Sequence, residues 1–564
     1  MVRKICGAKE KTMIRNDNLP KTQYKNPVLY GDYSDPDAIR VGSDYYMVSS
    51  SFSNSPAIPV LHSKDLINWK VINYVCPQIP EERYFEPTHG CGVWAPSLRY
   101  HNNLYYCYFP MPDEGIYVST TPDITGKWSD PVKILSGAGY IDPCPFWDDD
   151  RKAYLICAVA FSRCGRKSIL LLTTMSEDGL SLTGEFRIIY DANNTENETL
   201  EGPKLYKRNG FYYIFAPAGG VKVGHQVVLR SRNIYGPYEC RIVLKQGKSD
   251  VNGPHQGAWV DTLNGENYFL HFQDVYAGGR IVHMQPLTWV DDWPVIGSFA
   301  PGESFGEPVT EYAKPAGAEY VMQTRPDCDD SFQSSSLGLQ WQWNANYENS
   351  WYEIRPELGM LLMPVYKENK RPLSDVKNLL LQKWPAPEFD CETVMDLSKL
   401  GPGCQAGIVS LGQSYAGICV SRTALDEYRL CLIKGYQHYL KTGERDSSEY
   451  NFNNHTSHTE ETTESIPIDS ERLKDAGYLV TFRIFVRIRE YRNHLDRTDY
   501  LGREQWAMHI PSEEIILSCF DSEIAIPALA GRWVGVKNGV FCFGNSKTAG
   551  GPAVVKSVKY KFIH

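Results

Sequence analysis

Three carboxylates recur at corresponding positions of a repeated sequence pattern. Asp35, Asp142 and Glu201 each stand at the start of one repeat, and Trp94 and His255 start the other two. Hydrolysis of a glycosidic bond needs one carboxylic acid that protonates the leaving oxygen and one carboxylate that activates water or attacks the sugar. A third carboxylate near the acid raises the acid's pKa by like-charge repulsion. The set therefore has the residue types that this chemistry requires.

Each of these positions has a simpler interpretation when it is taken alone. Asp-Pro and Glu-Gly-Pro sequences are common at turns and at the starts of strands. Three carboxylates together with a Trp and a His in equivalent places of one repeat are not explained by turn chemistry. We therefore interpret the five positions as one site.

The repeats themselves predict the scaffold. A proline or small residue, an apolar strand, a turn and then aromatic residues occur five times, with anchors 60, 47, 60 and 54 residues apart at Pro36, Pro96, Pro143, Pro203 and Gly257. This period suits four short strands, and the Gly, Asn and Asp residues at the centre of each repeat are typical of hairpins. We predict an all-β protein with a five-bladed β-propeller over residues 25–322, after an N-terminal extension of residues 1–24. The first strands of the blades line the axis, so their opening residues converge there.

The pattern stops near Gln323, and short strand-like runs that do not repeat it continue to the end of the chain. We predict a β-sandwich domain of the concanavalin-like type over residues 323–564. The polar stretch from Lys441 to Ser470 is predicted to be a long surface loop.

Composition narrows the classes of function. The net charge is -9 and the sequence has no basic run, which disfavours a nucleic-acid partner. No apolar stretch is long enough for a membrane span, and the N-terminus has no apolar signal region. The chain as written is therefore expected to be cytoplasmic, or secreted or periplasmic if a signal was removed. The 15 cysteines follow no zinc-like spacing and predict buried, reduced thiols. No feature indicates an oligomeric state.

Several segments together resemble glycoside hydrolase family 43, in the branch of β-xylosidases and α-L-arabinofuranosidases. They are NPVLYGDYSDPDAIRVGSDYYMVSSSF, GVWAPSLRY, GYIDPCPFWDDD, LEGPKLYKRNGFYYIFAPAGG and GGRIVHMQPLTWVDDWPVIG. The later stretch DDSFQSSSLGLQWQWNANYENSWYEI resembles the β-sandwich that follows the propeller in two-domain members. The resemblance implies an exo-acting, inverting enzyme that releases terminal xylose from xylo-oligosaccharides or xylan.

The resemblance also implies a role for individual residues. Asp35 matches the general base, Glu201 the general acid, and Asp142 the carboxylate that tunes and orients the acid. Asp37 is the rival to Asp35, with a turn or strand-start residue as its other interpretation. Inversion implies that the carboxyl groups of Asp35 and Glu201 lie roughly 6.5–9.5 Å apart.

The remaining candidates would bind the substrate. Phe52 and Trp94 match aromatic walls of a terminal-sugar pocket, although a propeller core also uses aromatic residues. Arg280 resembles an arginine that contacts sugar hydroxyls. His255 matches a histidine near the axis that contacts substrate, a water or a calcium ion, with a structural channel histidine as the alternative. No cofactor is expected to be required.

Two acidic runs, Trp147–Asp150 and Val290–Asp292, have the residue types of metal ligands, but their place in the repeats favours solvated hairpin turns. The stretch SFSNSPAIPVLHSKDL departs from the family where many xylosidases have Pro-Gly, which leaves xylose and arabinose both open as the substrate sugar. An α-L-arabinofuranosidase, or an enzyme active on both sugars, is thus the first alternative, and a glycan-binding propeller without catalysis is the second. We further expect a pit closed at one end and a sandwich loop at its rim.

Overall fold

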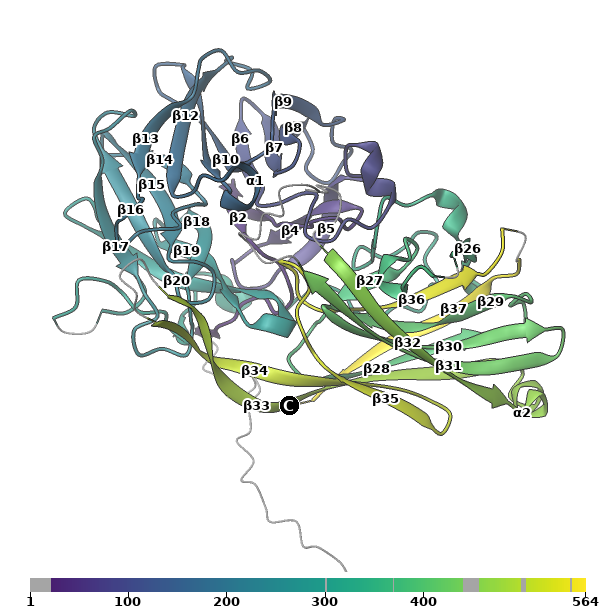
Figure 1. Cartoon of the computed structure of the whole chain (residues 1–564). Helices are drawn as coiled ribbons and strands as arrows, with labels where there is room; N and C mark the ends of the chain where they lie inside the picture. Colours follow the sequence, from purple (N-terminus) through teal and green to yellow (C-terminus); the bar gives the residue numbers. More distant parts are fainter. Residues whose placement is uncertain are drawn as a thin grey trace, which may run out of the picture.

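The computed structural model describes residues 22–299, 302–368, 370–439, 456–498, 504–547 and 550–563. The chain folds into a propeller and a sandwich that lie against each other (Figure 1). The N-terminal part of the predicted extension, residues 1–21, lies outside the described residues.

Five four-stranded antiparallel sheets form the blades of the propeller, as the five repeats predict. In each sheet the strands follow chain order, because a hairpin joins each strand to the next. Blades 1 and 2 contain β2 (Asp37–Val41), β3 (Asp44–Val48), β4 (Ala57–Ser63), β5 (Lys70–Cys76), β6 (Ser97–His101), β7 (Leu104–Met111), β8 (Gly115–Thr121) and β9 (Val132–Ser136). Blade 3 contains β10 (Tyr140–Trp147), β11 (Ala153–Val159), β12 (Ile169–Met175) and β13 (Arg187–Asp191). Blades 4 and 5 contain β14 (Lys204–Arg208), β15 (Phe211–Ala218), β16 (His225–Ser231), β17 (Glu239–Leu244), β18 (His255–Asp261), β19 (Asn267–Asp274), β20 (Arg280–Val290) and β21 (Trp293–Ile296).

Apolar side chains fill the spaces between neighbouring blades. Each pair of adjacent sheets encloses its own buried cluster, including the pair made by blade 5 and blade 1, which closes the ring. The chain also joins its own ends, because β1 (Gln23–Lys25) pairs with β22 (Glu311–Ala313). This packing fixes the inner strands, from which the site residues come.

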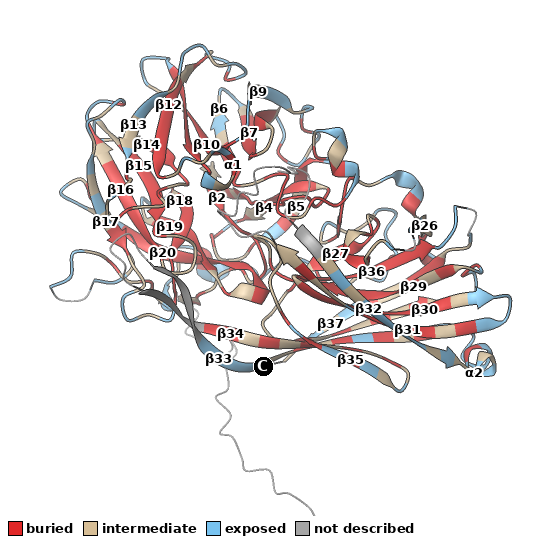
Figure 2. Ribbon diagram, viewed as in Figure 1, coloured by how far each residue is buried: buried red, intermediate tan, exposed pale blue. Residues whose placement is uncertain are grey.

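Two stacked sheets form the second domain, as predicted. One runs in the order β23 (Gln342–Trp343), β27 (Leu380–Lys383), β36 (Lys537–Gly544), β29 (Cys404–Leu411), β30 (Ser414–Ala424), β31 (Glu427–Tyr439) and β32 (Thr456–Ile468), with β26 (Val365–Tyr366) beside β36. The other runs β24 (Tyr352–Arg355), β25 (Gly359–Leu362), β37 (Ala553–Phe562), β28 (Phe389–Asp396), β33 (Leu479–Thr498), β34 (Glu504–Cys519) and β35 (Ser522–Pro527). Alternate residues of β28 are buried, as expected for a strand with one face in the core. Buried residues run through the strands of both the propeller and the sandwich (Figure 2).

The prediction of a surface loop from Lys441 to Ser470 is wrong over Thr456–Ile468, which forms β32. β32 is the outermost strand of its sheet, so it needs few apolar residues, and its Glu side chains discourage further edge pairing. Residues 440–455 lie outside the described residues.

Helices contribute little to the described part of the chain. They are α1 (Phe161–Cys164) and α2 (Ser470–Asp475), and neither could cross a membrane. Cysteines within the described ranges are all free and mostly buried, as the sequence predicts.

Candidate active site

A cavity of about 490 Å³ opens among the inner strands of the propeller. Six of the seven residues that the sequence singles out line it, and these are Asp35, Phe52, Trp94, Asp142, Glu201 and Arg280. The seventh, His255, is fully buried directly behind Glu201. The repeats thus bring together residues that lie up to 245 positions apart in the chain.

Local backbone strain turns several of these side chains toward the cavity. Asp35, Phe52, Asp142 and Gln256 all have positive φ angles, between 36° and 56°. Asp142 and Gln256 sit at register shifts in the first strand of their blades. Positive φ is uncommon for non-glycine residues and unusual for a bulky one such as Phe52, and such strain clusters at functional sites. The shared irregularity marks these positions as more than strand starts.

Asp35 is held by two donors at the buried side of the cavity. The Ser50 hydroxyl donates to its Oδ2 at 2.6 Å, and Arg280 Nη1 donates to Oδ1 at 3.1 Å and to Oδ2 at 3.3 Å. The side chains of Asp35 and Arg280 are 7% and 9% exposed. Hydrogen bonds to a charged partner are short and directional. These contacts therefore fix the orientation of the Asp35 carboxyl group at the buried side of the cavity.

Asp142 accepts hydrogen bonds from two neutral donors and has no cationic hydrogen-bond partner among the described residues. Its Oδ2 accepts the backbone N–H of Gly202 at 2.8 Å, and Gln256 Nε2 donates to Oδ1 at 3.3 Å. Burial, followed by the charge of Glu201 and more weakly that of Asp35, raises the pKa of Asp142 to about 7. The charge of Glu201 thus contributes more to this raised pKa than the charge of Asp35 does. That Asp142 lies nearer to Glu201 than to Asp35 stays a prediction.

Glu201 lies closer to the solvent than Asp35 does. Its side chain is 27% exposed, and its Oε1 is 3.0 Å from His255 Nε2. His255 starts β18 and is packed against the ring of Phe272. Through this contact the histidine can orient the carboxyl group of Glu201, whereas its expected contact with substrate, a water or a calcium ion stays a prediction.

Aromatic rings form one wall, and one of them comes from the sandwich. Phe52 and Trp94 have ring centroids 6.1 Å apart, and Trp94 and Trp533 are also 6.1 Å apart. Trp533 lies between β35 and β36 and lines the cavity. Apolar ring faces suit the carbon face of a sugar. The expected sandwich loop at the rim is therefore present, and Trp533 is its contribution.

Asp37, the rival to Asp35, has a structural role. It is fully buried and does not line the cavity; its Oδ2 accepts from Arg99 Nη1 at 2.7 Å and from the backbone N–H of Leu98 at 2.8 Å. Lys204 Nζ lies 3.6 Å from the same oxygen. Asp37 therefore ties blade 1 to blades 2 and 4.

The two acidic runs lie at hairpin turns, as expected. Asp148 follows β10 and binds Lys207 and Tyr212, while Asp292 precedes β21 and accepts from Arg208 at 3.0 Å. Among the residues that the structure describes, no three His, Cys, Asp or Glu side chains are grouped so that they could hold a metal ion. Calcium takes six to eight oxygen ligands, which include carbonyl groups and waters as well as carboxylates. A calcium ion near His255 therefore stays an expectation of the resemblance, and the chemistry below uses no metal.

Sequence reasoning missed several residues that line or support the cavity. Gln256 follows His255 directly and could have been found as a blade-opening residue. Ser50 and Phe161 belong to no repeated motif, and Phe161 starts α1 at the cavity mouth with 47% of its surface exposed. Nothing in the sequence around Trp533 indicates that it reaches the propeller.

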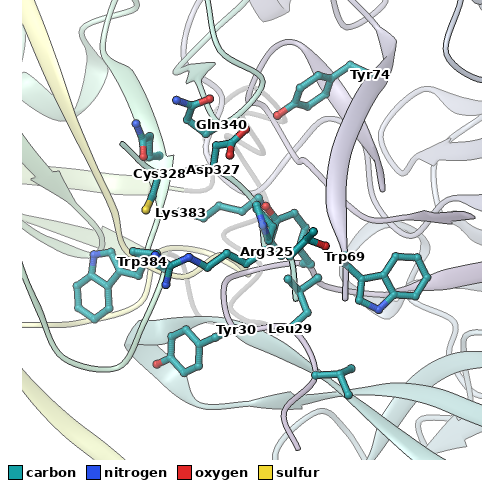
Figure 3. A pocket seen from close by; sticks show the side chains of 16 residues that line it. Leu29, Tyr30, Trp69, Tyr74, Arg325, Asp327, Cys328, Gln340, Lys383 and Trp384 are labelled. Carbon is teal, nitrogen blue, oxygen red and sulfur yellow. The ribbon is translucent and has the colours of Figure 1, made fainter. Parts of the chain in front are cut away.

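A second cavity, of about 140 Å³, lies between the two domains (Figure 3). Tyr30, Trp69, Lys383 and Trp384 are among the residues around it, and none of the predicted site residues lines it within the described structure. The three candidate catalytic carboxylates therefore meet at the larger cavity and not at this one.

Comparison with known proteins agrees with this arrangement. The family model for Glycosyl hydrolases family 43 matches residues 24–294, and that for the Beta xylosidase C-terminal Concanavalin A-like domain matches residues 329–561. A protein from Xylanibacter ruminicola named "Putative beta-xylosidase" is 40% identical over 396 residues, which are 70% of this chain and 72% of that protein. The chain belongs to glycosyl hydrolases family 43.

More distant members of family 43 are similar over much of the chain. A non-reducing end alpha-L-arabinofuranosidase from Bacteroides ovatus is 30% identical over 61% of this chain and 66% of its own. The crystal structure of a xylan beta-1,4-xylosidase from Bacillus halodurans superposes with a TM-score of 0.71 at 23% identity, covering 95% of this chain and all of that one. The latter similarity supports the two-domain fold. Family membership makes this protein a glycosidase, and the alternative of a propeller that only binds glycans is not favoured.

The raised pKa of Asp142 predicts how Asp142→Asn changes stability. Between its ordinary value of 3.8 and about 7, the folded wild type holds a proton on Asp142 that the unfolded chain has released. This group's contribution is thus fully present below about pH 4 and is lost as the pH rises to about 7. Asparagine has no such dependence. We expect the free energy of unfolding of the variant, relative to wild type, to rise by a few kcal/mol over that interval.

Urea denaturation of both proteins at several pH values measures this difference. A difference that stays constant from pH 4 to 7 would contradict the assigned environment of Asp142.

Proposed function

We propose that this protein is an exo-acting, inverting β-xylosidase that removes terminal xylose from xylo-oligosaccharides. The proposal rests on the difference in exposure between the two carboxyl groups that face the cavity. The base, Asp35, is at the buried side together with Arg280, while the acid, Glu201, is nearer the mouth. A terminal sugar placed between them has its leaving oxygen toward the solvent, where the rest of the chain can extend.

The contacts of each carboxyl group support its part in the reaction. Asp35, oriented by Ser50 and Arg280, removes a proton from a water molecule beneath the sugar, and that water attacks the anomeric carbon. Glu201 protonates the leaving oxygen, and Asp142, whose pKa is raised by burial and by the charge of Glu201, tunes and orients this acid. Arg280 also borders the cavity and can donate hydrogen bonds to a sugar hydroxyl.

Xylose is favoured as the sugar because the Xylanibacter relative, named as a beta-xylosidase, is more similar to this chain than the Bacteroides arabinofuranosidase is. The two sugars are pentoses of similar size. Arabinofuranosidase activity is therefore the second candidate.

A panel of 4-nitrophenyl pentosides, together with xylobiose and polymeric xylan, tests the proposal. We expect the highest kcat/KM on the β-xyloside, release of xylose from the end of xylobiose, and no internal oligosaccharides from xylan. A preference for the α-L-arabinofuranoside would replace the substrate assignment. Release of internal oligosaccharides would contradict exo action, and inactivity on the whole panel would contradict the proposed function.

A further inference from the structure

Asp32, three residues before Asp35, joins the propeller to the sandwich through one buried carboxylate. It is 3% exposed. Its Oδ1 accepts the backbone N–H of Arg280 at 3.1 Å, and its Oδ2 accepts the backbone N–H of Gly535 at 2.9 Å. Its backbone carbonyl accepts Lys383 Nζ from the sandwich at 2.7 Å. Each oxygen of Asp32 thus binds a different part of the molecule.

The hydrogen bond from the Arg280 N–H connects Asp32 to the proposed base, Asp35. Arg280 donates its backbone N–H to Asp32 and its guanidinium to Asp35, so two hydrogen bonds close a ring through residues 32–35. The position of the Arg280 main chain therefore determines where its guanidinium meets the base. A buried N–H that loses its acceptor is costly, so the main chain would shift toward another partner.

The hydrogen bond from the Gly535 N–H connects Asp32 to the aromatic wall of the cavity. Gly535 is two residues from Trp533, and the next residue, Val536, donates its N–H to the carbonyl of Ala277 at 2.8 Å. A Cβ on Gly535 would lie 2.8 Å from Cα of Gly279, and a Cβ on Gly279 would lie 2.6 Å from Cβ of Asp32. The two glycines allow the sandwich loop to approach Asp32 closely enough for the hydrogen bond.

The negative charge of Asp32 also favours the packing of the sandwich against this part of the propeller. Lys383 and Lys537 are register partners on β27 and β36, where Lys537 is buried and Lys383 is half-buried. The carboxylate of Asp32 favours the charged form of each lysine against the effect of burial. Lys383 is seen beside Trp384 at the domain boundary in Figure 3.

We propose that Asp32 is a positioning residue for hydrolysis, which holds Arg280 against the base and Trp533 against the pocket wall at the same time. This inference rests on the proposed function, since it assigns Asp32 an effect on turnover at that site. It explains why the sandwich is part of the catalytic unit: the loop that carries Trp533 and the arginine that binds Asp35 share one acceptor.

The test compares Asp32→Asn with Asp330→Asn. Asp330 also accepts hydrogen bonds with both carboxylate oxygens, from the Phe332 N–H and from the Trp341 ring and the Gln340 amide, but it lies in the sandwich and does not line the cavity. A displacement on the order of 1 Å at a reacting group can cost about 100-fold in rate. We expect Asp32→Asn to lower kcat on 4-nitrophenyl β-xyloside about 10- to 100-fold, measured well below its unfolding temperature. Asp330→Asn should lower the unfolding temperature and leave kcat within about twofold of wild type.

Combining Asp32→Asn with substitutions of Arg280 and Trp533, the two residues that Asp32 is proposed to position, distinguishes a positioning role from a purely structural one. In an Arg280→Lys, Trp533→Ala background, we expect Asp32→Asn to cost less than about threefold, because its targets are already altered. Wild-type kcat in Asp32→Asn, or the same fold-loss in both backgrounds, would overturn the proposal. A wild-type enzyme inactive on every pentoside would instead overturn the proposed function.

If Asp32→Asn does not fold, Gly535→Ala gives an independent answer. The added methyl group would lie 2.8 Å from backbone atoms of Gly279, so the sandwich loop or the backbone just before Arg280 must move. We expect a loss of kcat/KM that falls to less than about threefold in the Arg280→Lys, Trp533→Ala background. An unchanged kcat/KM in Gly535→Ala, or the same loss in both backgrounds, would overturn the proposal.

Discussion

Replacing Asp35 with alanine is expected to lower kcat about 10²- to 10⁴-fold on every substrate, whatever the leaving group. The reason is that an inverting enzyme has no second route to an activated water, and even an easily displaced phenol still needs a nucleophile. The loss should appear equally on 4-nitrophenyl β-xyloside and on xylobiose. Initial rates on both substrates, with circular dichroism to verify folding, measure it.

Asp149→Ala is the matched control for this prediction. Asp149 belongs to the acidic turn after β10, its side chain is 87% exposed, and Lys207 is its ion-pair partner at 2.9 Å. We expect its kcat to equal that of wild type. If Asp35→Ala kept substantial activity on the aryl xyloside while losing it on xylobiose, Asp35 would act on the leaving group and not as the base.

The sequence was sufficient to predict the five-bladed fold and the convergence of the three carboxylates, because both follow from the repeated pattern. A blade is one local unit of four strands, so its pattern is visible within about 50 residues, and propeller geometry then places equivalent positions around one axis. Asp35, Asp142 and Glu201 line the same cavity for that reason. The resemblance already favoured Asp35 over Asp37, and the structure adds what Asp37 does instead, because its ion pairs come from other blades.

Residues whose place depends on packing between domains could not be predicted. Trp533 is more than 430 positions from Trp94, and no repeat relates the two. The polar sequence of β32 was misinterpreted because an edge strand does not need the alternating apolar pattern of a covered strand. Asp32 was not singled out by the sequence, since its partners Arg280 and Gly535 are distant along the chain.

Replacing Glu201 with alanine should produce losses that depend on the leaving group. Glu201 lies toward the mouth of the cavity, beside the expected leaving oxygen, and its proton is needed only if that oxygen departs poorly as an anion. Xylobiose leaves a sugar alkoxide, so we expect a loss of about 10²- to 10⁴-fold. An aryl xyloside with a strongly acidic phenol needs little protonation, and we expect it to retain most of the wild-type rate.

Glu198→Ala serves as the control. It removes the same side chain three residues upstream, where Glu198 is 23% exposed and pairs with Lys167 at 2.9 Å. It should affect xylobiose and the aryl xyloside to the same small extent, whereas Glu201→Ala should separate them by at least about tenfold.

The pH dependence and the product configuration complete the test of Glu201. For the wild type, kcat/KM should fall at high pH as the acid loses its proton, and this fall should vanish for Glu201→Ala on the activated aryl xyloside.

Proton NMR of the fresh product should show α-xylose first from a β-xyloside, as inversion requires, with the carboxyls of Asp35 and Glu201 roughly 6.5–9.5 Å apart. Equal losses on both substrates would remove Glu201 from the role of acid. Initial release of β-xylose would mean that Asp35 attacks the sugar directly, since a retained configuration needs a covalent intermediate on the enzyme.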